Sequence, residues 1–287
     1  MAEICWLASY PKSGNTWLRA FLANYMRNPD RPLPINELPN FIFGDGLAAP
    51  YLAVSGKASA DDLSDEDANK LRPQVQEMFS RSSPDTVFVK THNAVALVEG
   101  VPTIVPQFTG GAVYVIRNPL DVAVSYAHHF KIPVEQAADA LAHEDNFTPA
   151  HGNLVFQHLS SWSRHVKSWV DAPGMLHHVV RYEDMTRKPV KAFGGVVEFL
   201  GMPLNPERLK KALKFSSFRE MSSQEKDAGF IESVPDGDGG KRRFFRKGRV
   251  GAWRAEMDDK LKQRIIDDHK EMMLRFGYLT TDGRLRI

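Results

Sequence analysis

The 287-residue chain is 43% hydrophobic and carries a formal net charge of only +2 at pH 7, so it can bury a large core but lacks the charge of a general nucleic-acid binder. No run of 18 uncharged apolar residues and no basic-then-hydrophobic leader indicates membrane insertion or export, and the cytoplasm is therefore the expected location. The single cysteine, Cys5, excludes internal disulfides and multi-cysteine metal sites.

The first expected element is a strand over residues 4–8, which leads through a tight turn directly into a helix that ends near Asn28. The turn has the spacing of a phosphate loop, Gly-x-x-x-x-Gly-Lys-Ser/Thr, with Gly14 at the second glycine, but its lysine lies three residues upstream at Lys12. Unsatisfied N–H groups at a helix start and the positive end of the helix dipole attract anions. The turn is therefore expected to bind phosphate, and a plain turn with a solvated lysine is the alternative.

Residues 29–60 are rich in proline and glycine, which predicts irregular structure and a mobile loop beside the turn. An acidic stretch at residues 61–67 follows, in which Ser64 and Asp67 have the pattern of a capping box for a helix towards Phe79. Pro73 is expected to interrupt or kink this helix. The acidic run is interpreted as a solvated helix start rather than a metal site.

Three more apolar runs, at residues 86–89, 112–116 and 178–182, have the pattern of buried strands. Helical periodicity fits six segments: residues 120–129, 134–143, 153–170, 188–200, 206–214 and 257–276. Because strands alternate with helices, we expect an α/β fold with a central parallel sheet flanked by helices, built as a single domain over residues 1–287. Residues 222–249 are polar and glycine-rich, end in a basic cluster, and are expected to form a second mobile loop.

Cations follow two predicted strands at the position where a kinase or ATPase would place a magnesium-binding aspartate. Lys90 and His92 follow one strand and Arg117 follows the next, while Asp121 is interpreted as a helix-cap or turn residue. Ligands of open parallel sheets bind beyond the carboxyl ends of the strands. The pattern favours a heavily phosphorylated donor that side chains neutralise without metal. It disfavours the alternative, a P-loop-type small-molecule or nucleotide kinase.

Taken in order, these segments resemble the cytosolic-type sulfotransferases, whose donor is 3'-phosphoadenosine 5'-phosphosulfate (PAPS). Residues 10–17 are similar to the family's P-loop-like 5'-phosphosulfate loop, and residues 113–126 are similar to its 3'-phosphate segment. Residues 90–92, 181–185 and 245–253 resemble further family segments. The resemblance runs from residue 7 to about residue 254 and implies transfer of a sulfuryl group to a hydroxyl by in-line attack, with 3',5'-bisphosphoadenosine (PAP) as product and no metal.

The resemblance also implies a role for each matched residue. His92 would be the general base, Lys12 would stabilise the leaving phosphate, and Lys90 would assist the transferring sulfate. The implied donor-binding residues are Lys12, Ser13, Gly14, Asn15, Thr16, Trp17, Arg117, Ser125, Tyr182, Ser216, Phe218, Arg246, Lys247 and Gly248. Trp17 would stack on the adenine, and packing at the helix start is the alternative for this ring.

Three residues depart from the family pattern: Asn15 and Ser216 stand where threonine is usual, and Ala252 stands where aspartate is usual. A loop with asparagine is similar to that of bacterial enzymes that sulfate natural-product scaffolds. The implied acceptor is a small-molecule phenol or alcohol. The family's C-terminal dimerisation pattern is missing, which leaves the oligomeric state open. The pairs His128-His129 and His177-His178 lack partner carboxylates at metal-ligand spacing and are interpreted as packing residues.

Overall fold

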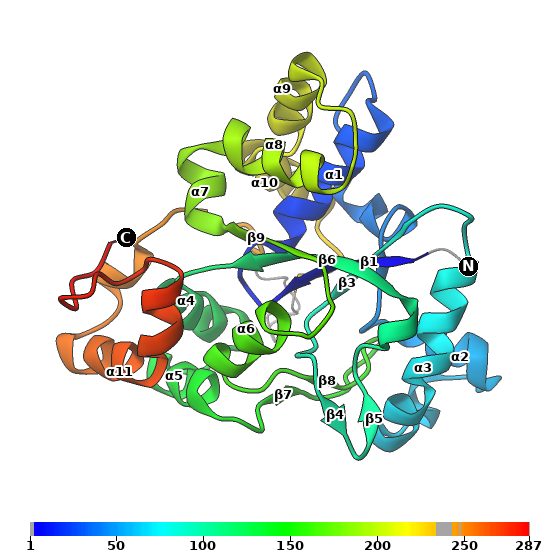
Figure 1. The fold of residues 1–287 in the computed structure, drawn as a ribbon, viewed down its shortest axis with the longest axis horizontal. Helices are drawn as coiled ribbons and strands as arrows, with labels where there is room; N and C mark the ends of the chain where they lie inside the picture. The colour runs from blue at the N-terminus through cyan, green and yellow to red at the C-terminus, as the bar shows by residue number, and fades with distance from the viewer. Residues whose placement is uncertain (1–2, 234–242, 247, 287) are drawn as a thin grey trace. The chain divides into compact units, whose positions relative to one another are not determined.

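The computed structural model describes residues 3–233, 243–246 and 248–286 of the chain (Figure 1). In this described part, five strands form the main sheet, in the order β2-β3-β1-β6-β9. Their bounds are Phe43–Gly44 (β2), Val87–Thr91 (β3), Ile4–Ser9 (β1), Thr109–Ile116 (β6) and His177–Arg181 (β9). Both β1 and β2 pair with β3 in parallel, and Leu7 of β1 lies opposite Lys90 of β3. The predicted α/β fold, with a central parallel sheet flanked by helices, is confirmed.

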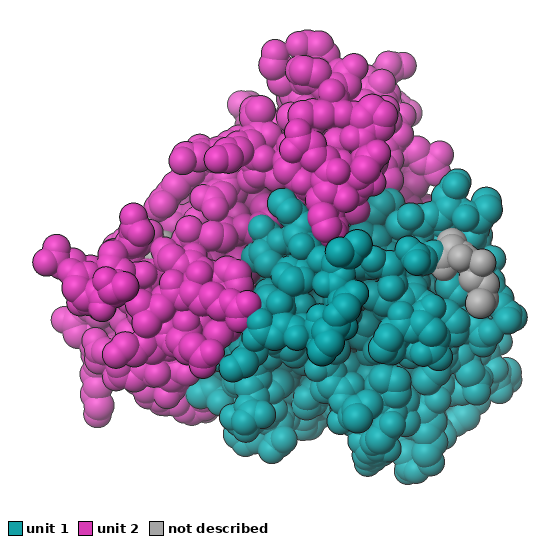
Figure 2. Space-filling model, in the orientation of Figure 1, with its two compact units in different colours: residues 1–10, 42–114, 140–179 teal, residues 11–41, 115–139, 180–287 magenta. Residues whose placement is uncertain are grey.

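The chain divides into two compact units, which Figure 2 shows in different colours. Unit 1 comprises residues 1–10, 42–114 and 140–179, and unit 2 comprises residues 11–41, 115–139 and 180–287. The chain passes between the units after residue 10, after residue 41, within β6, within helix α5 (Val134–Ala142) and within β9. The predicted base His92 belongs to unit 1, whereas Lys12 and Arg117 belong to unit 2. The single domain over residues 1–287 stays a prediction.

Unit 1 contains the buried strand β1 and the helices and short strands around it. Every residue of β1 is buried, as its continuous apolar sequence predicts. The remaining elements of this unit are α2 (Ala48–Ser55), η2 (Ala60–Asp62), α3 (Asp65–Arg81), β4 (Leu97–Val98), β5 (Val101–Pro102), η3 (Pro106–Phe108), β7 (Phe147–Thr148), β8 (Gln157–His158) and α6 (Trp162–Val170). Helix α5 (Val134–Ala142) begins in unit 2 and ends in unit 1.

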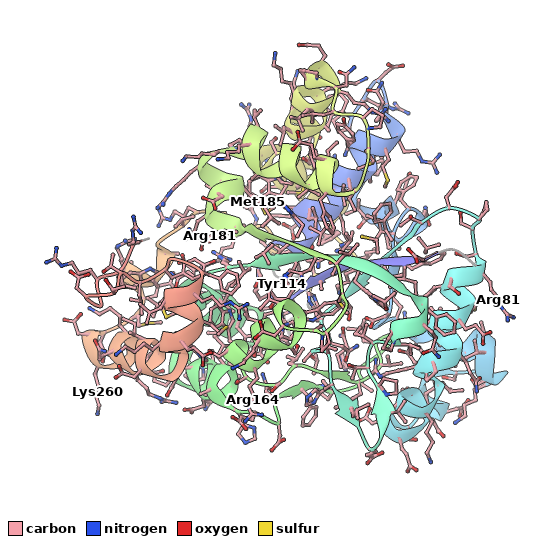
Figure 3. All side chains as sticks on the ribbon, in the orientation of Figure 1. Arg81, Tyr114, Arg164, Arg181, Met185 and Lys260 are labelled. Atoms are coloured by element: carbon pink, nitrogen blue, oxygen red, sulfur yellow. The ribbon has the colours of Figure 1, made fainter. Side chains whose placement is uncertain are left out.

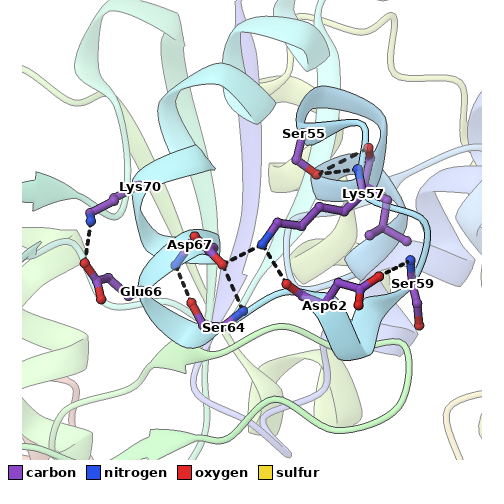
Figure 4. A network of polar contacts seen from close by, with 9 residues as sticks. Ser55, Lys57, Ser59, Asp62, Ser64, Glu66, Asp67 and Lys70 are labelled. Atoms are coloured by element: carbon purple, nitrogen blue, oxygen red, sulfur yellow. Dashed lines mark hydrogen bonds and ion pairs between the residues drawn. The ribbon is translucent and has the colours of Figure 1, made fainter.

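The capping box predicted for α3 is confirmed (Figure 4). The Ser64 hydroxyl accepts a hydrogen bond from the Asp67 amide at 3.0 Å, and the Asp67 carboxylate accepts one from the Ser64 amide at 3.3 Å. Lys57 Nζ also lies 2.6 Å from Asp67 Oδ2, and this bond is the main reason why the pKa of Asp67 falls to about 2. The predicted interruption at Pro73 is wrong, because α3 continues through that residue.

Three further expectations about local structure are wrong. Residues 29–60 are not irregular throughout, because η1 (Ile35–Asn40) and α2 form there; Pro50 lies in the first turn of α2, where a missing N–H is tolerated. The helix expected over residues 153–170 begins only at Trp162, where the Ser161 hydroxyl caps it by accepting from the Arg164 amide. Residues 222–228, expected in a loop, belong to helix α10.

Unit 2 is mainly helical. Its elements are α1 (Asn15–Arg27), η1, α4 (Pro119–Phe130), α7 (Tyr182–Arg187), α8 (Pro189–Phe199), α9 (Pro206–Phe215), α10 (Phe218–Ala228), η4 (Ala252–Ala255) and α11 (Asp259–Arg275). Helix α1 packs against α9, and α11 packs against α4. The Phe21 ring of α1 lies 4.3 Å from the Phe193 ring of α8, centroid to centroid. None of the helices in the part of the chain that is described is long and apolar enough to cross a bilayer.

Candidate functional site

The turn before α1 has a backbone suited to holding an anion. Lys12 and Gly14 both adopt left-handed conformations, with φ of 68° and 108°. Gly14 is the N-cap of α1, and no side-chain hydrogen bond caps that helix. The Ser13 hydroxyl is buried and has no hydrogen-bond partner among the described residues. Backbone N–H groups of such a turn and an unsatisfied hydroxyl are the groups that a phosphate oxygen would satisfy.

Gly14 is required at this turn for two reasons. Its φ of 108° is strained for any residue with a side chain, and a Cβ there would lie only 2.7 Å from Cδ2 of the Tyr182 ring. Tyr182 is buried at the start of α7, and burial is the main cause that raises the pKa of its hydroxyl. The Tyr182 ring therefore packs directly on the turn.

Arg117 connects the turn to the end of β6. Its Nη1 donates to the Lys12 carbonyl oxygen at 3.0 Å, and its guanidinium lies 4.3 Å from the centroid of the Tyr182 ring. The side chain is buried, yet its Nε has no hydrogen-bond partner within the described chain. Its Nη2 reaches the Arg249 carbonyl oxygen at 3.5 Å. A buried guanidinium with an unused N–H beside the turn provides positive charge for an anionic ligand.

The Glu183 carboxylate fixes the backbone at the end of β6. Glu183 Oε1 accepts from the Asn118 amide at 3.0 Å, and Glu183 Oε2 accepts from the Tyr278 hydroxyl at 3.0 Å. Burial is the largest cause that raises the pKa of Glu183. Figure 3 labels Arg181 and Met185, which flank this segment in sequence. The carboxylate holds the backbone that carries Arg117.

Asp121 holds the segment that follows the second predicted mobile loop, residues 222–249, which is called the late loop. Its carboxylate accepts from the Gly251 amide at 2.8 Å and from the Trp253 amide at 3.2 Å. The interpretation of Asp121 as a cap or turn residue is therefore incomplete, because its side chain contacts a segment 130 residues away. Ser125, one turn further along α4, is half-buried.

The late loop itself is described in part. Arg246 Nη2 donates to Glu256 Oε1 at 3.0 Å. Gly248 has a φ of 56°, and a Cβ there would lie 2.2 Å from Cδ2 of the Phe218 ring, so these two predicted residues are in close contact. Lys247 lies outside the described residues.

Two residues predicted on the adenine side already have partners in the protein. The Trp17 ring lies 5.9 Å from the Tyr182 ring and 5.4 Å from the Phe193 ring, although its Nε1 has no hydrogen-bond partner in the described part. Ser216 is fully buried, and its hydroxyl donates to the Ala212 carbonyl oxygen at 2.8 Å. In the turn, Asn15 and Thr16 are buried, and the Thr16 hydroxyl donates to Glu232 Oε2 at 3.3 Å.

In unit 1, His92 follows β3 and is held from two sides. Its Nδ1 lies 2.7 Å from the Ser9 carbonyl oxygen, and because a carbonyl only accepts, Nδ1 carries the proton. In the neutral ring, Nε2 then has the lone pair that can take a proton. The His92 carbonyl oxygen accepts from His165 Nε2 at 3.0 Å, and the Tyr114 hydroxyl donates to His165 Nδ1 at 2.8 Å. Tyr114, labelled on β6 in Figure 3, thus supports His92 through His165.

A buried polar network fixes the residues on each side of His92. Asp45 Oδ2 accepts from the Thr91 hydroxyl at 2.9 Å and from Asn93 Nδ2 at 3.0 Å. Burial raises the pKa of Asp45, and the nearby Arg72 guanidinium partly opposes that rise. The Asp45 amide donates to the Lys90 carbonyl oxygen at 3.1 Å. The network therefore orders the segment from Lys90 to Asn93.

The sequence analysis missed Asp45, His165 and Glu225, and the reason differs in each case. Glu225 is a buried carboxylate that accepts from the Phe244 and Phe245 amides. Asp45 lies in a segment expected to be irregular, His165 in a helix with no recognised motif, and Glu225 in a segment expected to be a loop. In the described residues, no group of three or more His, Cys, Asp or Glu side chains lies close enough together to hold a metal ion.

Comparisons with known proteins show the family of the chain. The sulfotransferase domain family matches residues 3–277, so the chain belongs to the sulfotransferase family. Dog (Canis lupus familiaris) sulfotransferase 1A1 is 27% identical over 273 residues, which cover 93% of this chain and 82% of the dog protein. Cattle (Bos taurus) sulfotransferase 1E1 is 29% identical over 279 residues, which cover 94% of this chain and 82% of the cattle protein.

The fold is also that of solved sulfotransferases. The crystal structure of mouse sulfotransferase SULT7A1 complexed with PAP has a TM-score of 0.58 and 23% identity, and the match covers 95% of this chain and 84% of the mouse chain. Together with the family match, this similarity identifies the protein as an enzyme of the sulfotransferase class.

Proposed function

We infer that this protein transfers a sulfuryl group from PAPS to the hydroxyl of a small molecule. The observation that carries the proposal is the turn before α1, where the buried Ser13 hydroxyl is unsatisfied and Arg117, whose Nε is also unsatisfied, donates to the Lys12 carbonyl oxygen. Donors and cations of this kind fit the phosphate groups of the donor. Family membership supports the same reaction, and the related mouse enzyme was crystallised with PAP.

The donor is proposed to contact unit 2 through four groups of residues. The turn from Lys12 to Trp17 would hold the 5'-phosphosulfate, and Arg117 with Ser125 would hold the 3'-phosphate. Tyr182, Ser216 and Phe218, together with the Trp17 ring, would lie on the adenine side. The late loop, with Arg246, Lys247 and Gly248, would close over the 3'-phosphate. Each of these roles rests on the family resemblance.

In the proposed reaction, the acceptor oxygen attacks sulfur while the bond between sulfur and the bridging oxygen of the 5'-phosphate breaks. The hydroxyl proton passes to Nε2 of His92, and the products are a sulfate ester and PAP. The Nδ1 contact with the Ser9 carbonyl supports this tautomer of His92. Lys12 would donate to the bridging oxygen as its negative charge grows, and Lys90 would assist the sulfate oxygens.

A kinase is not favoured, because the chain belongs to the sulfotransferase family and has Asn15 where a phosphate loop has its lysine. The proposed acceptor is a phenol or alcohol, including natural-product scaffolds, and the proposed location is the cytoplasm.

The test is to incubate the protein with PAPS and a panel of phenols, alcohols and sugars, and to measure both PAP release and the mass of the sulfated product. Parallel incubations contain ATP with magnesium in place of PAPS. We expect stoichiometric PAP and sulfate ester from at least one acceptor, and a large loss with His92→Ala although PAP still binds. PAP binding without turnover of any acceptor, or phosphorylation from ATP, would refute the proposal.

A further inference from the structure

Two side chains hold the ammonium group of Lys12, and neither of them was predicted to belong to the site. Lys12 Nζ lies 3.3 Å from His129 Nδ1 and 3.9 Å from the centroid of the Phe244 ring. His129 belongs to α4, and Phe244 belongs to the short described segment from residue 243 to residue 246. All three residues lie in unit 2. The two contacts restrict where the end of the lysine side chain can be.

The contact with His129 defines the state of its ring. A lysine ammonium only donates hydrogen bonds, so Nδ1 of His129 must carry the lone pair and the ring proton is on Nε2. The ring is also fixed in orientation, because it lies edge-on to Phe130 at 4.8 Å and edge-on to Phe244 at 6.1 Å. His129 is therefore a rigid hydrogen-bond acceptor for Lys12.

Phe244 is held in turn by the buried carboxylate of Glu225. Glu225 Oε1 accepts from the Phe244 amide at 2.5 Å and from the Ser233 hydroxyl at 3.0 Å, and Glu225 Oε2 accepts from the Phe245 amide at 2.9 Å. The Phe230 ring lies 5.0 Å from the Phe244 ring. Because the amides of Phe244 and Phe245 both donate to the Glu225 carboxylate, this part of the backbone is fixed, and the Phe244 ring is held in place against Lys12.

We propose that His129, Phe244 and Glu225 are positioning residues that hold Lys12 in place for the departing phosphate. This inference rests on the proposed function, in which Lys12 donates to the bridging oxygen. A lysine side chain has several freely rotating bonds, and ordering it opposes the reaction unless the protein has already restricted it. A donor held in place before the reaction needs no rearrangement as charge develops, and its advantage is expressed in the rate of the chemical step.

Variants of His129 test the hydrogen bond. His129→Leu removes the acceptor, whereas His129→Asn places a carbonyl oxygen close to the position of Nδ1. His177→Leu, at an exposed histidine of β9, is the matched control. With PAPS and the best acceptor of the panel, His129→Leu should lower kcat about tenfold while KM for PAPS changes less than about twofold, and His129→Asn should recover most of that loss.

Variants on the other side of Lys12 test the aromatic contact. Phe244→Leu removes the ring face and Phe244→Tyr keeps it, so only the first should lower kcat, by about three- to tenfold. Glu225→Gln keeps the shape of the side chain but can accept through one oxygen only, and it should lower kcat in the same way. Circular dichroism and PAP binding establish that each variant is folded.

Faster turnover in His129→Leu would mean that the contact holds Lys12 away from the donor, and it would overturn the inference. The inference would also be overturned if His129→Leu and His129→Asn lowered kcat equally, or if kcat were unchanged in both His129→Leu and Phe244→Leu. If the wild-type enzyme turns over, these results refute only the positioning role. Absence of wild-type turnover with every acceptor would refute the proposed function and this inference together.

Discussion

Asp121→Asn is expected to destabilise unit 2 and to weaken donor binding through the late loop. The Asp121 side chain is buried and accepts two backbone hydrogen bonds, at 2.8 Å from Gly251 and at 3.2 Å from Trp253. Asparagine has nearly the same shape but offers one oxygen and one NH₂ group. The backbone amide of Gly251 or of Trp253 would therefore face the side-chain NH₂ group of the asparagine and would lose its hydrogen-bond acceptor.

The size of the effect follows from these contacts. A hydrogen bond to a charged group contributes about 1.5 to 3 kcal/mol, and a buried amide left unsatisfied costs about 1 to 3 kcal/mol. Because both values describe the same lost contact and are not added, we expect Asp121→Asn to lower the free energy of unfolding by about 1 to 3 kcal/mol. Because the segment from residue 251 to residue 253 directly follows the late loop, the affinity for PAP should fall by about tenfold, which corresponds to about 1.4 kcal/mol.

Urea unfolding followed by circular dichroism measures the first effect, and titration calorimetry with PAP measures the second. Asp139→Asn is the control, because that carboxylate forms an exposed ion pair with Arg264. Exposed pairs contribute about 0 to 1 kcal/mol, so the control should remain close to wild type in both assays. Equal stability of Asp121→Asn and Asp139→Asn would show that the Asp121 contacts do not hold the late loop.

Three further results are expected. Lys12→Ala should lower kcat by about 100-fold or more while PAP affinity, measured by calorimetry, falls less than about tenfold; equal losses would exclude a role confined to the transition state. Arg117→Lys should weaken PAP binding by about 10- to 100-fold, because lysine cannot both stack on Tyr182 and reach the Lys12 carbonyl, and unchanged binding would contradict this. Burial lowers the pKa of His165 to about 3 from 6.5, so the unfolded chain binds a proton that the folded chain does not. The stability that the buried neutral His165 ring contributes is therefore complete above its unfolded pKa of 6.5 and is lost as the pH falls below that value. The free energy of unfolding, measured with urea, should therefore fall between about pH 6 and pH 5, and His165→Phe should make that fall smaller by about 1.4 kcal/mol per pH unit. An equal fall in the wild type and in His165→Phe would contradict the lowered pKa of His165.

The sequence predicted the parts of this protein that depend on local patterns. The strand β1, the start of α1 and the capping box of α3 each follow from a short run of residues whose preferences agree. The loop spacing predicted Gly14 in the turn before the first helix, and the structure has it there, where its φ and its close contact with Tyr182 both require glycine. Family membership was visible because the matched segments keep their order along the chain.

The remaining parts depend on contacts that are distant in sequence. Asp45 acts on Thr91 and Asn93, 46 and 48 residues further along, and nothing near Asp45 indicates those partners. The second part of α10, residues 222–228, could not be recognised as helical because the helix is polar and its buried face is narrow, with Met221 and Glu225 buried. A carboxylate such as Glu225 resembles a surface residue until the amides it accepts from are known.

The buried carboxylates explain how a nearly neutral chain can present a basic site. Asp121 and Glu183 lie close in sequence to Arg117 or Tyr182, yet their oxygens accept from the backbone amides of Gly251, Trp253 and Asn118. A carboxylate whose oxygens already accept from amides or, in Glu183, from an amide and the Tyr278 hydroxyl, has less capacity to form a hydrogen-bonded pair with a guanidinium, and it orders the backbone that carries the cation. Arg117 instead donates to the Lys12 and Arg249 carbonyl oxygens, and although it attracts Glu183 electrostatically, its unsatisfied Nε can still meet an anionic ligand. A basic site of this kind depends less on the number of cations than on where the neighbouring carboxylates find their hydrogen-bond donors.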